Sequence, residues 1–280
     1  MMNKDEILLN AQKALFYEVA TPIKPGLVDP VTHGAHQDMD IYTFIDSSLV
    51  LRPYFEECFD VGINFWGRLP ALFEELRSRG IRAEKVMLTE TGGVNTHKGA
   101  IFSLGIFVAA TAYLKQTQTE FSMIKIQKII QQMLPNLLKN DFRNLATKKG
   151  LTAGEKQYLK YGHTGIRGEA MQGYPTVAKG VAFLEMTTGT KQERILDTLM
   201  FLASKVADSN LVKRADNPQI LIWMQKQSEI YFAKGGAKKD AGRKYLKDLD
   251  QLFSEKQYSL GGTADILIAT LFCGLMMRII

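Results

Sequence analysis

The sequence predicts an all-α fold, a multi-helix domain whose functional loops lie between the helices. Three observations support this prediction. Apolar residues recur at helical spacing through most of the chain, capping signals precede several of these stretches, and sustained alternation with a period of two is nearly absent. The 280 residues suffice for a substantial core, and no low-complexity linker or internal repeat divides them. We therefore expect residues 1–280 to form a single all-helical domain.

The helices are expected in the following order along the chain. The opening stretch places Ile7, Leu8, Ala11 and Val19 on one stripe. Further stretches with helical spacing cover residues 39–59, 100–115, 122–138, 177–187, 191–206, 218–232, 238–253 and 263–277. Pro53 is expected to break or kink the helix over 39–59, because proline lacks the amide hydrogen and clashes with the preceding turn.

Start and stop signals support several of these helices. Residues 152–155 and 190–193 both have the Thr-x-x-Glu pattern of a capping box. Asn217 followed by Pro218 offers a cap and then proline at the first helical turn. The run 234–239, with its Gly-Gly pair, is typical of a glycine-rich helix end followed by a solvated basic helix face rather than of a domain boundary.

The composition is that of an ordinary globular protein, with 46% hydrophobic and 23% charged residues, and excludes disordered and fibrous classes. A formal charge of +6 suits anionic partners without selecting among nucleic acid, a membrane surface and phosphorylated small molecules. Cys58 and Cys273 lie far apart in apolar stretches, which indicates buried or free thiols in a reducing, cytoplasmic compartment. No signal peptide is visible, and the apolar stretch 266–277 is shorter than the ~20 residues that a membrane span needs.

Chemistry concentrates in five polar segments between the helices, which contain or adjoin all four histidines of the chain. The first segment, 24–40, carries three carboxylates (Asp29, Asp38 and Asp40) and the imidazoles of His33 and His36. Asp38 and Asp40 are suited to hold a hard cation, and a histidine beside them to carry a proton. Alternatively, one of these acids caps the helix that begins near residue 39.

The second and third segments suggest anion binding. In 91–99, the glycines, a helix start and Lys98 are typical of a phosphate site, although no Walker A pattern occurs in the chain. In 161–175, four glycines exclude one continuous helix. Arg167 is suited to bidentate phosphate binding, and Glu169 to metal binding or to a role as a base. An Arg–Glu pair that stitches the loop is the alternative.

The fourth and fifth segments lie near the C-terminal end of the chain. Residues 208–214 are expected to close a long helix with polar groups and two cations, and an exposed helix end is the favoured explanation of this segment taken alone. Residues 259–265 open the last apolar helix, where Gly261 and Gly262 offer amides to an anion. Asp265 caps this helix or meets a phosphate through a metal ion.

These segments together resemble one enzyme family. The run from Lys24 to Asp40, the run Gly-Val-Asn-Thr-His-Lys-Gly-Ala-Ile-Phe at 93–102, Arg-Gly-Glu-Ala at 167–170 and Gly-Gly-Thr-Ala-Asp at 261–265 are similar to the triphosphoribosyl-dephospho-coenzyme A synthases. The likeness extends over about residues 17–270. The family often has Pro where this chain has Leu260, glycines in place of 215–216, and Asn in place of His33, so His33 is left out of the predicted site.

The resemblance implies an all-α pentosyltransferase that joins ATP to 3'-dephospho-CoA and releases adenine. The product, 2'-(5''-triphosphoribosyl)-3'-dephospho-CoA, is the precursor of the prosthetic group of citrate lyase or, in a sister branch, of malonate decarboxylase. The family implies a divalent cation, Mg²⁺, and a transient link to the transferase that loads the finished group, with no nucleic acid and no membrane as partner. We expect catalytic roles for His36, His97 and Asp29, with proton transfer by His36 or His97. The expected substrate-binding residues are Lys24, Asn95, Thr96, Lys98, Arg167, Asn210, Arg214, Gly261 and Gly262, and the expected metal ligands are Asp38, Asp40, Glu169 and Asp265.

Two other functions are compatible with parts of this sequence. A metal-dependent helical hydrolase of nucleotides or ADP-ribose would use the same carboxylates to activate water instead of a ribose hydroxyl. A nucleic-acid-binding helical module would use the cations Lys234, Lys238, Lys239, Arg243, Lys244 and Lys247. That helix also carries acids and offers no aromatic platform beyond Tyr245, which disfavours nucleic-acid binding.

Overall fold

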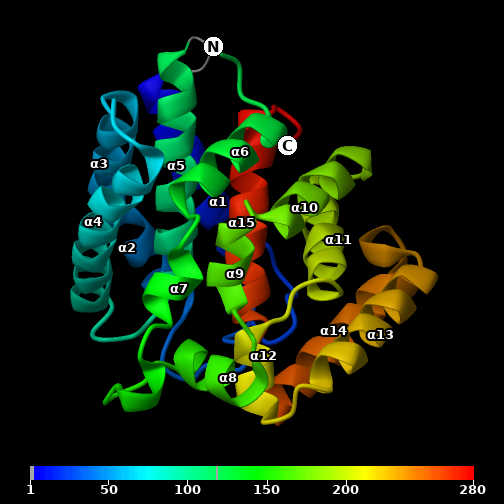
Figure 1. Ribbon diagram of the computed structural model, residues 1–280. Helices are drawn as coiled ribbons and strands as arrows, with labels where there is room; N and C mark the ends of the chain where they lie inside the picture. The colour runs from blue at the N-terminus through cyan, green and yellow to red at the C-terminus, as the bar shows by residue number, and fades with distance from the viewer. Residues whose placement is uncertain (1–2, 118) are drawn as a thin grey trace.

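The computed structural model describes residues 3–117 and 119–280, and within them every regular element is a helix (Figure 1). This confirms the predicted all-α fold. The helices are α1 (Lys4–Val19), α2 (Ile41–Val50), α3 (Arg52–Ile63), α4 (Leu69–Glu90), α5 (Lys98–Gln116), α6 (Met123–Met133), α7 (Leu137–Asp141), η1 (Leu145–Thr147), α8 (Ala153–Tyr161), α9 (Gly165–Met171), α10 (Pro175–Met186), α11 (Lys191–Ala203), α12 (Ser209–Ala215), α13 (Ile220–Ala233), η2 (Gly236–Lys238), α14 (Asp240–Lys256) and α15 (Gly261–Met276).

Two apolar helices, α5 and α15, pack side by side at the centre of the molecule (Figure 1). Helices α3, α4 and α6 pack against α5, and α1, α10 and α11 against α15. Helix α5 has the length and hydropathy of a membrane span, but 72% of its apolar window is buried inside the protein, as in the central helix of a globular core. One cluster of buried side chains extends from α1 to α15. Both central helices begin at the same end of the molecule, where the polar loops gather (Figure 1).

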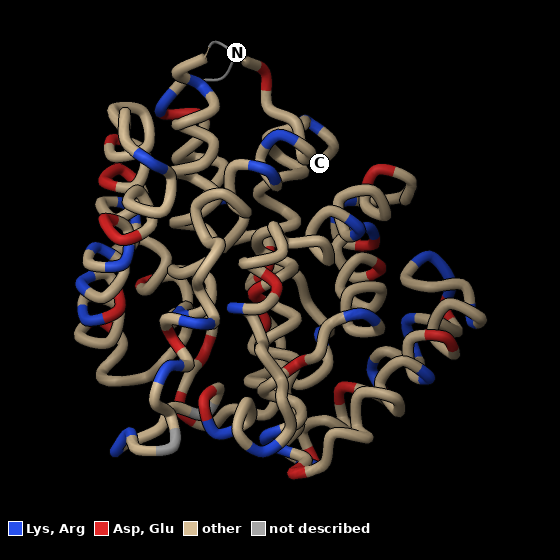
Figure 2. The backbone as a smooth tube through the Cα atoms, in the orientation of Figure 1, with Lys and Arg blue, Asp and Glu red and all other residues tan. Residues whose placement is uncertain are grey.

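The outer helices carry most of the charge. In Figure 2, Lys and Arg alternate with Asp and Glu along α4 and α14, whereas the middle of α5 and of α15 is almost free of charged residues. The α13–α14 pair lies at the edge of the molecule (Figure 1), and its cations partly pair with acids of the same helix, as Lys244 does with Asp248 at 3.0 Å. Sign alternation of this kind is typical of a solvated helix face.

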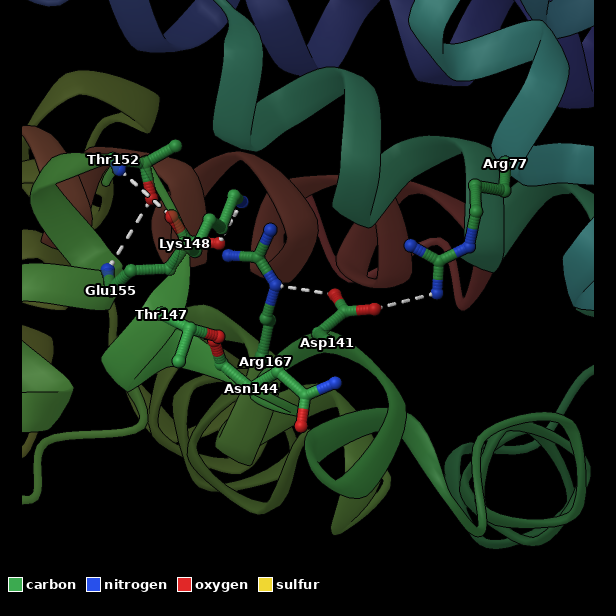
Figure 3. Close-up of polar contacts among 8 residues, drawn as sticks. All are labelled: Arg77, Asp141, Asn144, Thr147, Lys148, Thr152, Glu155 and Arg167. Atoms are coloured by element: carbon green, nitrogen blue, oxygen red, sulfur yellow. Dashed lines mark hydrogen bonds and ion pairs between the residues drawn. The ribbon is translucent and has the colours of Figure 1, made fainter. Parts of the chain in front are cut away.

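Several local predictions are confirmed. The stretch 39–59 forms two helices that meet at Leu51, and Pro53 lies in the first turn of α3, where its missing amide costs no hydrogen bond. Thr152 and Thr190 form the capping boxes that begin α8 and α11; the first is drawn in Figure 3. The glycine run ends α13 with Gly235 in the left-handed region, at φ 91°, as a helix stop requires.

The structure differs from the expected elements in three places. Helix α4 was not predicted, although Pro70 lies in its first turn and Leu72, Leu76 and Ala83 face the core, because Gly80 interrupts its apolar stripe and charged residues cover its other side. Asn217 does not cap α13, which begins at Ile220; its side chain accepts from the Gln219 amide instead. Residues 208–214 do not close the preceding helix but begin a new one, α12.

Candidate active site

Two cavities open beside the starts of α12 and α15. The first also borders the start of α5 and the loop 24–40, and the second borders α9 and the residues just before it. The first, of about 320 Å³, is called here the basic cavity, because Lys98, Lys213 and Arg214 line it. The second, of about 340 Å³, is called the glycine cavity, because Gly162, Gly165 and Gly168 line it. Asn210 and Asp265 line both cavities, so the two spaces adjoin at these side chains.

Asp265 lies near the start of α15, against the first turn of α5. A Cβ atom at position 99 would overlap its carboxylate oxygens, so a glycine is needed there for the two helices to approach. Burial and, to a smaller extent, the charges of Asp208 and Glu18 raise the pKa of Asp265 to about 8, against a hydrogen bond from the Ala100 amide. Since the side chain still lines both cavities, it is a carboxyl that can carry a proton at neutral pH and still meet a ligand.

Asp208, which the sequence did not single out, joins two helix starts. Its buried carboxylate accepts from the amides of Asn210 (2.9 Å) and Leu211 (3.0 Å) at the start of α12. It also accepts from the Gly262 amide (3.3 Å), the Thr263 amide (2.7 Å) and the Thr263 hydroxyl (2.8 Å) at the start of α15. The anion at this helix start is therefore the protein's own carboxylate, and the expectation that the Gly262 amide serves a phosphate is corrected.

The Gly261–Gly262 pair has a steric role in this structure. A Cβ at 261 would lie 2.6 Å from the side-chain nitrogen (Nδ2) of Asn210, and one at 262 would lie 2.9 Å from a carboxylate oxygen of Asp208. The glycines thus permit α12 and α15 to pack closely at the boundary between the two cavities.

Lys24 is fully buried and paired. Its ammonium group bonds to the Glu18 side chain and, at 2.6 Å, to the Glu18 carbonyl. Lys24 is not among the residues that line either cavity, whereas Glu18 lines the basic cavity. The expectation that Lys24 binds substrate is therefore replaced by a structural one: its charge neutralises a carboxylate that would otherwise be buried unpaired.

Asp29 is likewise structural. Its buried carboxylate accepts from four backbone amides, those of Ile23 (2.6 Å), Lys24 (3.2 Å), Val31 (2.7 Å) and Thr32 (2.9 Å). These bonds hold the fold of the loop, and the side chain lines neither cavity. The assignment of Asp29 to catalysis is corrected on this geometry.

His36 and Arg214 form one unit at the basic cavity. Arg214 donates to the carbonyls of Ala35 (3.1 Å) and Gln257 (2.8 Å) and, at 3.3 Å, to His36 Nδ1. The other ring nitrogen of His36 lies 3.2 Å from the Ser259 hydroxyl. Burial, and then the Arg214 charge, lower the pKa of His36, while Asp38 opposes them. The neutral ring is thus engaged on both nitrogens, and it holds a guanidinium at the cavity.

The remaining cavity residues of the second segment also have protein partners. Asn95 accepts from the Lys98 amide at 3.2 Å and so helps to cap α5. The Lys98 ammonium pairs with Glu84, and both Asn95 and Lys98 line the basic cavity. The Thr96 hydroxyl donates to Ser47 Oγ at 2.7 Å. These side chains lie where the sequence placed them, at a helix start beside a cavity.

The four expected metal ligands do not gather. Asp40 caps α2 by accepting from the Thr43 amide, as the capping alternative states. Asp38 lines the basic cavity and is largely exposed, while Glu169 lines the glycine cavity and accepts from Thr176. Burial raises the pKa of Glu169. Within residues 3–117 and 119–280 no group of three or more His, Cys, Asp and Glu is placed to hold a metal ion, so these residues do not fit a resident metal centre.

Arg167 lines neither cavity, although its chain neighbours Ile166 and Gly168 line the glycine cavity. Its Nε donates to Asp141 Oδ2 at 2.6 Å, and Arg77 donates to the other oxygen at 2.8 Å, so one carboxylate bridges two guanidinium groups (Figure 3). The Arg167 ion pair links α9 to the end of α7. In the structure Arg167 therefore makes a packing contact in place of the expected contact with phosphate, and its partner is Asp141 instead of the Glu of the Arg–Glu alternative.

His97 is buried and lines neither cavity. Burial lowers its pKa to about 3, with Lys24 as the second cause, so the ring is neutral. Its Nδ1 lies 2.6 Å from Ser47 Oγ. Both this position and this low basicity favour a role for His97 other than the direct proton transfer expected from the sequence.

Sequence reasoning missed Glu18, Ser47, Asp208 and Lys213. Glu18 carried a signal, because an acid in the last turn of an otherwise apolar helix opposes the helix dipole and needs a partner. Asp208 and Lys213 lie in a segment that had been singled out, but their partners and the cavity come from tertiary packing. Ser47 carried no signal.

The chain is similar to known proteins over almost its whole length. The family model described as ATP:dephospho-CoA triphosphoribosyl transferase matches residues 4–279. A protein of Lactiplantibacillus plantarum named as a 2-(5''-triphosphoribosyl)-3'-dephosphocoenzyme-A synthase is 46% identical over the whole of both chains. Protein CitXG of Leuconostoc mesenteroides is 46% identical over 97% of this chain, which spans 59% of that relative's length.

A crystal structure titled as a triphosphoribosyl-dephospho-CoA synthase from Archaeoglobus fulgidus has the same fold, with a TM-score of 0.50 and 17% identity over 82% of this chain and 97% of that one. Nothing in these comparisons supports a hydrolase. The resemblance read from the sequence motifs is confirmed, and the chain belongs to the ATP:dephospho-CoA triphosphoribosyl transferase family.

Proposed function

We propose that the two adjoining cavities transfer the 5-triphosphoribosyl group of ATP to the 2'-hydroxyl of 3'-dephospho-CoA. The products are adenine and 2'-(5''-triphosphoribosyl)-3'-dephospho-CoA. One observation carries the proposal: Asp265 and Asn210 line both cavities, so two substrates can meet beside one protonated carboxyl. Family membership supplies the identity of the substrates.

The triphosphate belongs in the basic cavity. Lys98, Lys213 and Arg214 line it, whereas Lys205 is the cation of the glycine cavity. Two backbone carbonyls and His36 hold Arg214 in place, so the guanidinium needs little reorganisation when an anion arrives. Lys98 pairs with Glu84 in the free protein and would exchange that partner for phosphate oxygens.

Asp265 and Glu169, two carboxyl groups that line the cavities and have raised pKa values, divide the proton transfers, as in glycoside chemistry. Asp265 gives its proton to a ring nitrogen of the adenine while the bond between that base and the ribose anomeric carbon breaks. Glu169, on the acceptor side, takes the proton of the 2'-hydroxyl while its oxygen bonds to the same carbon. Charge and protons balance, because one carboxyl loses the proton that the other gains.

Mg²⁺ is proposed to enter with ATP rather than to reside in the protein. Triphosphate oxygens and water supply most of the ligands that Mg²⁺ prefers, and Asp38, exposed at the basic cavity, is the protein carboxylate that would join them. The cation would screen the triphosphate charge beside Asp38 and Asp265. The proton transfers above depend only on the chain's own residues.

We further propose that the enzyme works in the cytoplasm, where its two free, buried cysteines stay reduced. Its product serves citrate lyase or malonate decarboxylase, and a transient link to the transferase that loads the prosthetic group is part of the proposal. No nucleic acid and no membrane take part.

Incubation with ATP, Mg²⁺ and 3'-dephospho-CoA, followed by mass analysis, tests the function. The expected result is one adenine released for each triphosphoribosyl-dephospho-CoA formed. Release of adenine or phosphate at an equal rate without 3'-dephospho-CoA would instead identify a hydrolase.

A further inference from the structure

A chain of three side chains leads from the basic cavity into the core. Thr96 lines the cavity, and its hydroxyl donates to Ser47 Oγ at 2.7 Å. Ser47 Oγ in turn lies 2.6 Å from His97 Nδ1. Ser47 is 0% exposed and His97 1% exposed, so two of the three groups are shielded from solvent.

The surroundings fix the far end of this chain. The His97 ring meets the edge of Phe44 with centroids 5.0 Å apart, and the His97 amide donates to Met87 Sδ at 3.2 Å. Ser47 and Phe44 both belong to α2, which Asp40 caps. The ring is therefore held by packing, and its neutral state leaves Nδ1 able to accept a proton in a hydrogen bond.

The direction of the hydrogen bonds follows. With the ring proton of His97 on Nε2, which is buried without a hydrogen-bond partner among the described residues, Ser47 gives its single hydroxyl proton to Nδ1, and its oxygen accepts the proton of Thr96. The Thr96 oxygen then has only lone pairs left to offer a ligand in the basic cavity. A hydroxyl that is free in solution can donate or accept, but this one is committed to accept.

We propose that Ser47 and His97 position the Thr96 hydroxyl to accept a hydrogen bond from a ribose hydroxyl of ATP. Phosphate oxygens are acceptors and gain nothing from such a group, whereas the cations of the same cavity suit them. A ribose hydroxyl next to the phosphates is the donor that complements it. This inference rests on the proposed function, and it assigns to His97 a positioning role instead of the proton transfer expected from the sequence.

The chain offers a matched control in the neighbouring serine. Ser48 is also 0% exposed and lies on the same helix, but its hydroxyl donates to the Phe44 carbonyl within α2. Ser47→Ala and Ser48→Ala therefore remove the same atom from the same depth, and they differ in whether Thr96 loses its acceptor.

The experiment measures kcat/KM of wild type, Ser47→Ala and Ser48→Ala with ATP, 2'-deoxy-ATP, 3'-deoxy-ATP and inosine triphosphate, together with thermal melting. Wild type is expected to prefer ATP over one deoxy analogue by at least about tenfold. Ser47→Ala is expected to lose most of that preference by losing activity toward ATP, while Ser48→Ala keeps it. Thr96→Val, which keeps the shape at the cavity, is expected to lose the same preference if Ser47→Ala fails to fold.

Each other outcome has a separate meaning. A wild type that makes no product from ATP and 3'-dephospho-CoA overturns the proposed function. An active wild type whose preference among the nucleotides survives both Ser47→Ala and Thr96→Val overturns the positioning role. A preference lost against inosine triphosphate, and not against a deoxy analogue, would place the adenine amine at Thr96 and overturn the ribose assignment.

Discussion

Two carboxylates of this molecule, Asp265 and Asp141, differ in what surrounds them. Asp141 lies between the guanidinium groups of Arg77 and Arg167, so its charge is matched twice (Figure 3). Asp265 lies near the acids Asp208 and Glu18 at the boundary between two cavities, and its pKa is about 8. The comparison teaches that a carboxylate becomes chemically useful where the fold leaves its charge uncompensated, and structural where cations enclose it.

The largest expected effect is the loss of activity in Asp265→Asn. An amide cannot protonate the leaving adenine, and general acid catalysis contributes 10²–10⁴-fold, so kcat/KM should fall by about 10³-fold. Asp141→Asn should keep kcat/KM within about threefold and lower the melting temperature instead, because it leaves two guanidinium groups without their carboxylate. Adenine release and thermal melts of both variants provide the measurement. Equal activity losses would erase the contrast between the two acids.

The pH dependence sharpens the comparison further. The folded pKa of Asp265 lies above its ordinary value of 3.8, so the unfolded chain ionises first as the pH rises. Stability should therefore fall from about pH 4 to about pH 8, and Asp265→Asn should melt higher than wild type near pH 8 and lose this advantage near pH 4. The kcat/KM of wild type should fall about tenfold per unit above pH 8, as the acid loses its proton. Activity that rises through pH 8 would make Asp265 a base.

The two arginines offer a smaller contrast. Arg214→Ala should lower kcat/KM for ATP by at least about tenfold, which corresponds to about 1.4 kcal/mol, because it removes a preoriented cation from the basic cavity. Arg167→Ala should lower the melting temperature by a few degrees, about 2–4 °C per kcal/mol, with kcat/KM within about threefold. Arg214→Lys should recover only part of the loss. A tenfold loss in Arg167→Ala without destabilisation would return that residue to the site.

The smallest expected effect is on the melting temperature of the substrate-free protein when a chelator removes divalent cations. Turnover should stop when divalent cations are removed, since Mg²⁺ enters with the triphosphate. The melting temperature should stay within about 1 °C, because the described residues gather no metal site that a cation would stabilise. A marked fall in melting temperature on chelation would reveal a resident ion and give Asp265 a compensating charge after all.

Much of the fold was predictable, because helical spacing and capping signals are local. The break before Pro53 and the capping boxes at Thr152 and Thr190 needed only a few consecutive residues. Helix α4 was not predicted because its core-facing side is narrow and its other side is highly charged.

The sequence predicted which loops form the site, but not which of their residues bind a ligand and which make structural contacts. Lys24, Asp29 and Arg167 all lie in the expected segments, yet each is engaged by a partner or by amides that its own motif does not identify. Asp141, the partner of Arg167, is 26 residues away in the chain. Lys24 and Asp29, by contrast, have partners within six residues, which the fold of the loop brings to them. Whether a charged residue is free for a ligand depends on such tertiary contacts, and one sequence does not reveal them.

The contact between Gly99 and Asp265 also determines which amino-acid substitutions residue 99 would tolerate. Any side chain at 99 would press on the carboxyl that we assign to proton transfer, so a saturation library should accept glycine alone at this position. Gly99 would then look as indispensable as a catalytic residue, although it contributes no chemical group. Nearby, Gly92 and Gly93 have open space where a Cβ would lie, and alanine there would meet only the backbone cost of a positive φ. The three glycines of this short motif would thus tolerate substitution to different degrees. The least tolerant, Gly99, would indicate the contact between α5 and α15, and not a phosphate-binding site.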